Sequence, residues 1–80
     1  MSAIIYPNPS TGEFTIQFSE KPVVPVTIEL TDVTGQLIDR FLITDRTTVV
    51  NKPNLAKGIY YITIRNNEEV VVKKISILKT

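Results

Sequence analysis

The stretch that decides the fold reads EFTIQFS, from Glu13 to Ser19. Its apolar side chains stand at every second position, and polar side chains stand between them. Because successive side chains of an extended chain point to opposite faces, this period predicts a β-strand with one buried face. Residues 24–32 alternate in the same way and predict a second such strand, whose inward-facing residues are Val24, Val26, Ile28 and Leu30.

The rest of the chain carries the same bias. Nine Val, eleven Ile and ten Thr make up 30 of the 80 residues, and these β-branched side chains suit pleated, half-buried surfaces. Turn residues recur roughly every 8–12 residues, which is typical of a sandwich. We therefore predict an all-β, immunoglobulin-like antiparallel β-sandwich of about seven short strands with no helix. The expected strands are 3–6, 13–19, 24–32, 36–43, 47–50, 59–65 and 70–78.

The turns between these strands have their own signatures. Val33-Thr34-Gly35 predicts a three-residue hairpin loop with Gly35 in the left-handed region, and Asn66-Asn67 predicts a type I′ turn. The run from Pro7 to Gly12 predicts a turn in which Asn8 and Ser10 bond the local backbone. Residues 36–43 carry apolar side chains on both faces, so the sequence does not decide which face of this strand points inward.

Length, charge and composition exclude several classes of function. A chain of 80 residues makes one domain. Its formal charge of +1 gives no electrostatic field that would attract it to nucleic acid or to an anionic membrane. Without His or Cys there is no zinc finger, thiol nucleophile or Ser–His pair, and we expect no enzyme activity and no cofactor. No apolar run spans a membrane, and no signal peptide is visible. Residues 1–2 resemble an added expression start, and residues 3–79 are expected to form the single domain.

A tyrosine close to the start of a late strand has two structural interpretations. Immunoglobulin-like sandwiches place a tyrosine corner at such a position, and its hydroxyl bonds back to the upstream backbone. Leu55, Gly58 and Tyr60 are the candidates for this corner. The alternative is that Tyr60 is a core aromatic, and both interpretations make Tyr60 structural.

Charged residues offer two further candidate sites. Asp32, Asp39 and Asp45 are candidates for a cation site such as calcium. They lack the D-x-D-x-D-G spacing of a calcium loop. Lys73, Lys74 and Lys79 with Arg65 form either a basic patch or solvated strand faces that protect a sheet edge. Catalysis by a Ser–Lys pair is not indicated, because no motif places a serine beside an activated lysine.

Four short motifs occur in order along the chain: Tyr6-Pro7-Asn8-Pro9 with Gly12 and Phe14, residues 32–38 (DVTGQLI), residues 55–62 (LAKGIYYI) and residues 73–77 (KKISI). Together they resemble the type A C-terminal sorting domain of the type IX secretion system of Bacteroidetes. The resemblance covers residues 4–79. Lys74, directly before the apolar run, fits the C-terminal lysine of the family better than Lys73 does.

The resemblance implies a recognition module that ends a secreted cargo protein and does no chemistry. Such a domain passes through the periplasm, is recognised by the outer-membrane translocon with its shuttle and sortase components, and is cut off upstream of the first strand. The cargo is then joined to an anionic lipopolysaccharide at the cell surface or is released outside. A monomer without membrane insertion is expected, with a strand-swapped dimer as the alternative. The candidate recognition residues are Pro7, Asn8, Pro9, Gly12, Asp32, Gly35, Gly58, Lys73, Lys74 and Lys79.

Two other functions remain open at this point. An adhesive or carbohydrate-binding module of a secreted enzyme requires a platform of exposed aromatics, for which Tyr6, Phe41 and Tyr61 are the candidates. A spacer of the fibronectin type III kind requires no binding surface. It predicts that removal of residues 70–80 changes stability and leaves export unchanged.

Overall fold

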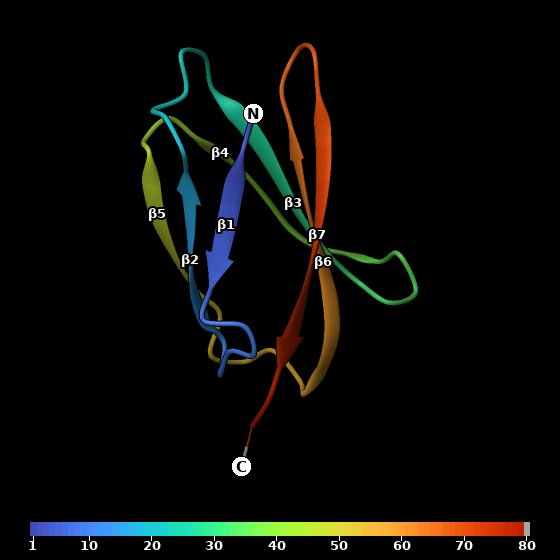
Figure 1. Cartoon of the computed structure of the whole chain (residues 1–80). Coiled ribbons are helices and arrows are strands. Elements are labelled where there is room, and N and C mark those ends of the chain that lie inside the picture. Colours follow the sequence, from blue (N-terminus) through green and yellow to red (C-terminus); the bar gives the residue numbers. More distant parts are fainter. Residues whose placement is uncertain (80) are drawn as a thin grey trace.

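The computed structural model describes residues 1–79 and shows seven strands without a helix in that part of the chain (Figure 1). The predicted all-β fold is therefore confirmed, with strand ends that agree within two residues. The strands are β1 (Ala3–Tyr6), β2 (Glu13–Phe18), β3 (Val26–Asp32), β4 (Leu37–Ile43), β5 (Thr47–Asn51), β6 (Gly58–Arg65) and β7 (Val70–Ile77).

The strands form two antiparallel sheets that face each other across one core (Figure 1). One sheet has the order β1-β2-β5 and the other has the order β4-β3-β6-β7. The chain changes sheet after β2, after β4 and after β5, which are connections of the immunoglobulin-like kind. Four strands therefore lie at sheet edges: β1, β5, β4 and β7.

The core consists of the alternating apolar side chains of both inner faces. Each fully buried Ile or Phe side chain contributes about 1.5–3 kcal/mol through removal of apolar surface from water. The open question about β4 is settled by burial, because Ile43 is buried and Phe41 packs against the core, whereas Ile38 and Leu42 are exposed. The buried core residues of the central strands are Phe14, Ile16, Phe18, Val26, Ile28, Leu30, Tyr60, Ile62 and Ile64.

The third strand begins later than the sequence predicts. Val24 was expected to face inward, but its side chain is 46% exposed and β3 starts at Val26, which pairs with Ile43. Pro25 has no backbone N–H to donate and restricts the residue before it. The alternation of apolar and polar residues therefore begins at Val24, two residues before the chain first pairs with another strand at Val26.

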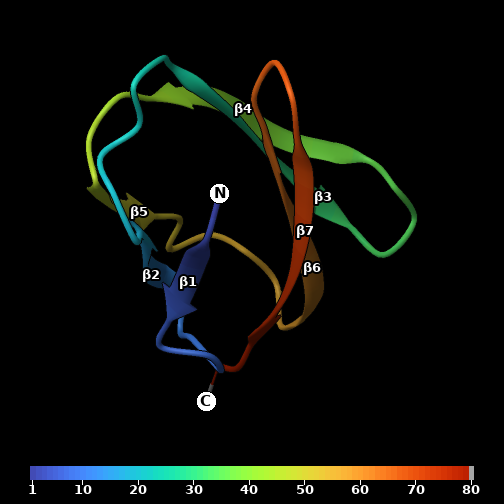
Figure 2. The ribbon, with the colours of Figure 1, turned by 45° about the horizontal axis from the view of Figure 1, so that its top comes forward.

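The hairpin between β3 and β4 matches its prediction and projects from the sandwich (Figure 2). Gly35 has a φ of 87°, and its N–H donates to the Asp32 carbonyl at 3.0 Å. The Asp32 N–H in turn donates to the Gln36 carbonyl at 3.0 Å, which closes a three-residue loop. Next to this loop, the pairing of β3 with β4 shifts register between Leu30 and Thr31, as at a β-bulge.

The loop between β6 and β7 differs from its prediction. A type I′ turn needs positive φ at both central residues, and within residues 1–79 only glycines have positive φ. Instead, the Asn66 side-chain oxygen accepts hydrogen bonds from the N–H groups of Glu68 at 2.8 Å and Glu69 at 2.7 Å. The loop is therefore four residues long, with Asn66 as an Asx-type turn residue.

Candidate functional site

The loop from Pro7 to Gly12, here called the PNP loop, lies along the edge of β7. The Asn8 side-chain amide donates to the Lys74 carbonyl at 3.0 Å, and its oxygen accepts from the Ser76 N–H at 3.0 Å. One side chain thus satisfies the donor and the acceptor that a neighbouring strand would otherwise satisfy. The predicted bonding of Asn8 to its own loop is wrong, because Asn8 joins the two ends of the sequence.

Ser10 continues this contact with its backbone and holds the PNP loop with its side chain. Its N–H donates to the Ser76 carbonyl at 2.9 Å, and its carbonyl accepts from the Leu78 N–H at 2.8 Å. The Ser10 hydroxyl donates to the Glu13 carbonyl at 2.7 Å and accepts from the Gly12 N–H at 3.0 Å. Ser10 is only 3% exposed and belongs to the structural contact, although the sequence suggested no more than a turn role for it.

Gly12 fits against the loop between β5 and β6. The Lys52 N–H donates to the Gly12 carbonyl at 2.8 Å, and Gly12 has a φ of 119°. A Cβ at this position would lie 2.7 Å from the Lys52 carbonyl oxygen. Backbone conformation and close approach both require glycine here.

The β5–β6 loop and the C-terminal end complete this end of the sandwich. The Lys79 ammonium donates to the Pro53 carbonyl, and the Tyr60 hydroxyl donates to the Ala56 carbonyl at 2.7 Å. The second contact is the hydrogen bond that defines a tyrosine corner, and the nearby Leu55 is buried.

The fold thus gathers several sequence motifs at one end. The end of β7, the PNP loop and the β5–β6 loop lie together at the lower end of the molecule in Figure 1. We call this region the motif end. Its candidate recognition residues are Pro7, Asn8, Pro9, Gly12, Gly58 and Lys79.

Asp32 and Gly35 lie away from the motif end, at the tip of the projecting hairpin (Figure 2). One carboxylate oxygen of Asp32 accepts from the Thr34 hydroxyl at 2.6 Å, the Thr34 N–H at 2.9 Å and the Gln36 N–H at 3.0 Å. The hydroxyl bond, followed by the backbone bonds, lowers the pKa of Asp32 below its ordinary value of 3.8. Asp32 therefore fixes the shape of the hairpin.

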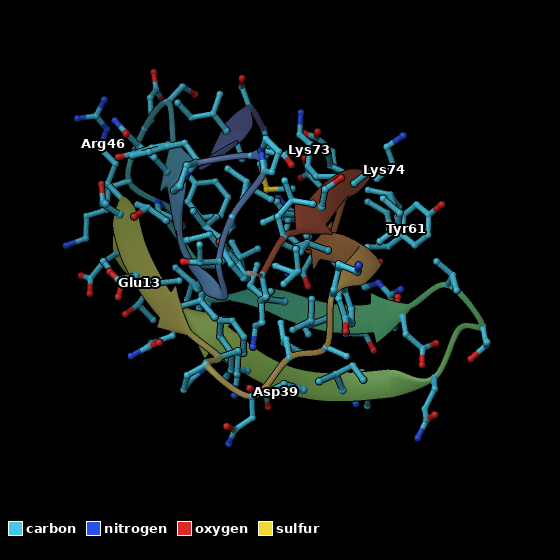
Figure 3. The ribbon with its side chains drawn as sticks, turned by 90° about the horizontal axis from the view of Figure 1, so that it is seen from below. Glu13, Asp39, Arg46, Tyr61, Lys73 and Lys74 are labelled. Carbon is cyan, nitrogen blue, oxygen red and sulfur yellow. The ribbon has the colours of Figure 1, made fainter. Side chains whose placement is uncertain are left out.

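Lys73 and Lys74 point to opposite sides of β7 (Figure 3). Lys74 lies on the outer face of the sheet beside its cross-strand partner Tyr61, whereas Lys73 points toward the rim between the two sheets. Arg65 lies at the far end of β6, where its guanidinium is 3.4 Å from the Glu29 carboxylate. These cations and Lys79 do not form one basic patch.

The three candidate aspartates are also separated. Asp39 pairs with the Lys52 ammonium at 2.5 Å, and this hydrogen bond lowers the pKa of Asp39 below 3.8. Asp32 is used by its own hairpin, and Asp45 lies in the β4–β5 loop. Within residues 1–79, no group of three or more acidic side chains is placed to hold a metal ion.

The aromatic platform of the adhesive alternative is not formed. Tyr6 lies exposed on β1 and donates its hydroxyl to the Gln17 side chain at 2.9 Å. Phe41 packs against the core from β4, and Tyr61 lies on the outer face of the other sheet. Since the three rings face three different directions, they offer no common binding surface.

Comparisons with known proteins agree with the motifs. The family model of the secretion system C-terminal sorting domain matches residues 4–78. The comparison with curated proteins finds no match. Among solved structures, PorZ is similar in fold, with a TM-score of 0.75 and 16% sequence identity over 96% of this chain. It is described as an essential bacterial surface component of the type IX secretion system of Porphyromonas gingivalis.

The match to PorZ covers only 11% of that protein, so the similarity concerns one domain of a much longer chain. In residues 1–79 there is no helix of the length and apolarity that crossing a membrane requires. The match to the sorting-domain family, in contrast, extends over nearly the whole sequence and includes all four motifs. The chain therefore belongs to the family of secretion system C-terminal sorting domains.

Proposed function

We propose that this domain is the C-terminal sorting signal of a cargo protein that the outer-membrane type IX translocon exports. The family match over residues 4–78 carries this proposal. The domain itself does no chemistry and serves as an address that other proteins recognise. Its cargo precedes Ala3 in the precursor and travels through the periplasm to the cell surface or the outside.

The geometry of the motif end supports a recognition role. Two motifs that lie at opposite ends of the sequence meet there, because Asn8 bonds the backbone of Lys74 and Ser76. Turns held by backbone contacts present a fixed surface, so a partner does not have to order them upon binding. We propose that the motif end is read by the translocon or its shuttle component, with Pro7, Asn8, Pro9 and Lys79 as the exposed contacts. The other candidates, Gly12, Asp32, Gly35, Gly58, Lys73 and Lys74, act through backbone shape, hairpin shape or the β7 edge.

After export, a cell-surface sortase is proposed to cut the chain upstream of β1 and to join the cargo to an anionic lipopolysaccharide. The domain is then a substrate of the sortase that is discarded after cleavage. It acts as a monomer in this proposal and does not insert into a membrane or bind nucleic acid.

A reporter fusion tests the export step. Residues 3–80 are attached to the C-terminus of a reporter that carries a periplasmic signal peptide, and surface display is measured in a host with a working type IX system. We expect display in that host and periplasmic retention in the same host without its translocon. Retention of a folded fusion in the working host would refute the proposal.

Two altered fusions separate a signal from a spacer. Removal of residues 70–80 deletes β7 and should leave the reporter in the periplasm, whereas the fibronectin type III spacer predicts unchanged export. Because this deletion also removes the buried Ile75 and Ile77, a second variant is needed that keeps the fold. Lys79→Ala removes one exposed contact to Pro53 and should reduce display, whereas Lys21→Ala in the distant β2–β3 loop should not.

A further inference from the structure

The edge of β7 is covered over only half of its length. In an antiparallel sheet, backbone groups of successive residues point alternately toward the two neighbouring strands. The groups of Lys74 and Ser76 that bond the PNP loop point away from β6. By this alternation, the N–H and C=O groups of Val70 and Val72 and the N–H of Lys74 point the same way. No strand among residues 1–79 pairs with β7 on this side.

The other three edges are blunted in ways that natural sheets commonly use. β1 has four residues and is followed directly by Pro7, and β5 has five residues and is followed closely by Pro53. β4 carries the charged pair Asp39 and Arg40 and lies opposite a register shift in β3. β7 also carries a charged pair, Lys73 and Lys74, but it is long and pairs with β6 in unbroken register along its eight residues. Its uncovered half begins with three consecutive valines, a sequence that favours strand pairing.

The charge along this edge indicates what kind of strand fits. From Val70 to Lys79 the chain has three lysines and no acidic residue, and the carboxylate of the preceding Glu69 is paired with the N-terminal ammonium at 2.9 Å. Lys74 stands on the outer face beside the edge, and Lys73 stands at the rim on the inner side (Figure 3). Side chains of an added strand would alternate between the same two faces. Two adjacent acidic residues would therefore meet one lysine each, and β-branched residues would lie beside Val70 and Val72.

We infer that the uncovered edge from Val70 to Lys74 binds an extended acidic segment of a partner protein, which adds a strand to the β4-β3-β6-β7 sheet. Asn8 and Ser10 occupy the edge beyond Lys74, so the added strand ends there and spans about five residues. A second copy of this chain fits less well, because antiparallel pairing of two such edges about Val72 would set Lys73 and Lys74 opposite Val71 and Val70 and would give the lysines no directly opposed acidic partner. The assignment of the partner to the export machinery rests on the proposed function.

Hydrogen exchange with a defined probe tests the inference. The full chain is labelled with ¹⁵N and titrated with the capped peptide Thr-Glu-Glu-Val-Thr-Val-Thr. At saturation, we expect amide exchange at Val70, Val72 and Lys74 to slow by about tenfold or more, because these N–H groups become donors to the peptide. The same peptide with lysines in place of the glutamates should bind about fivefold more weakly or worse, because exposed ion pairs become like-charge contacts.

Charge-reversed variants of the protein provide the matched control. The double variant Lys73→Glu and Lys74→Glu should bind the acidic peptide about tenfold more weakly, and the single change Lys74→Glu, on the outer face, should weaken it less. Lys21→Glu, in a distant loop, has the same change in net charge as Lys74→Glu and should bind like the wild type. Circular dichroism shows that each variant keeps its strands before the titration is interpreted.

Several results would overturn the inference. It is wrong if the acidic peptide protects no amide of β7, if it protects β4 or β1 instead, or if the lysine peptide binds equally well. Dimerisation of the free chain with protection of the same three amides would show that the occupant is a second copy. Export of the double-variant fusion at the wild-type level would refute the edge as a docking site while leaving the sorting function intact. Failure of the wild-type fusion would refute the sorting function, and the peptide titration would still decide the edge.

Discussion

Asn8→Ala removes the side-chain hydrogen bonds from Asn8 to β7 without altering any strand. Asn8 donates to the Lys74 carbonyl and accepts from the Ser76 N–H, both at 3.0 Å. The two backbone hydrogen bonds made by Ser10 remain in this variant. The substitution therefore measures what the side chain of Asn8 contributes to holding the last strand.

The expected loss follows from the number and exposure of the bonds. A hydrogen bond within a protein contributes about 0.5–1.5 kcal/mol net, because water replaces the lost partner. Both bonds of Asn8 are exposed, so water can reach the freed groups of Lys74 and Ser76. The free energy of unfolding should fall by about 1–2 kcal/mol. In a domain of this size, the melting temperature should fall by about 5–12 °C.

Urea unfolding gives the change in stability, and hydrogen exchange shows where it arises. The Ser76 amide should exchange faster in Asn8→Ala than the loss of global stability alone explains. Asn8→Asp keeps the acceptor for Ser76 but loses the donor for Lys74 and should lie between alanine and the wild type. Asn67→Ala in the exposed β6–β7 loop is the matched control and should leave stability unchanged. Equal stability of Asn8→Ala and wild type within about 0.3 kcal/mol, with unchanged Ser76 exchange, would refute this reasoning.

Three further predictions concern the turns. Gly12→Ala forces a Cβ against the Lys52 carbonyl and should lower the free energy of unfolding in urea by about 3 kcal/mol. Gly35→Ala, with open space around its Cβ, should lower it by about 1–2 kcal/mol. Equal losses in the two variants would contradict the close contact at Gly12. Tyr60→Phe removes only the hydroxyl bond of the tyrosine corner and should lower the free energy of unfolding by about 1 kcal/mol, which thermal unfolding can detect. Because the folded state lowers the pKa of Asp32, its carboxylate stabilises the fold above the ordinary value of 3.8, and this contribution is lost as the pH falls through the folded pKa. Asp32→Asn should therefore show a weaker loss of stability in acid than the wild type, and an unchanged acid profile would count against the hairpin contacts.

The sequence predicted most accurately what depends on near neighbours. Strand positions follow from a two-residue period, and the loop at Gly35 follows from turn chemistry within five residues. The tyrosine-corner hydrogen bond spans four residues, from Tyr60 back to Ala56. In each case the pattern that predicts the structure lies within a short stretch of the sequence.

The failures have physical causes of two kinds. Asn66 has two ways to make a turn, either with positive φ or through its side-chain oxygen, and the sequence does not distinguish them. Asn8 bonds residues that lie 66 and 68 positions away. Its local surroundings suggest only a turn, because the partner strand lies at the other end of the sequence. Which of the candidate residues a partner reads is still a prediction.

The contact between the PNP loop and β7 links the shape of the motif end to the folding of the whole domain. Lys74 and Ser76 lie 66 and 68 residues after Asn8, so Asn8 has no partner on β7 until that much of the chain has been synthesised. The same strand also contributes the buried Ile75 and Ile77 to the core, so the PNP loop contacts a strand that the core holds in place. A truncated or unfolded chain therefore lacks the motif end even though it contains the PNP sequence. Under the proposed function, a machinery that reads the motif end would accept a cargo only when this domain has been fully synthesised and is folded.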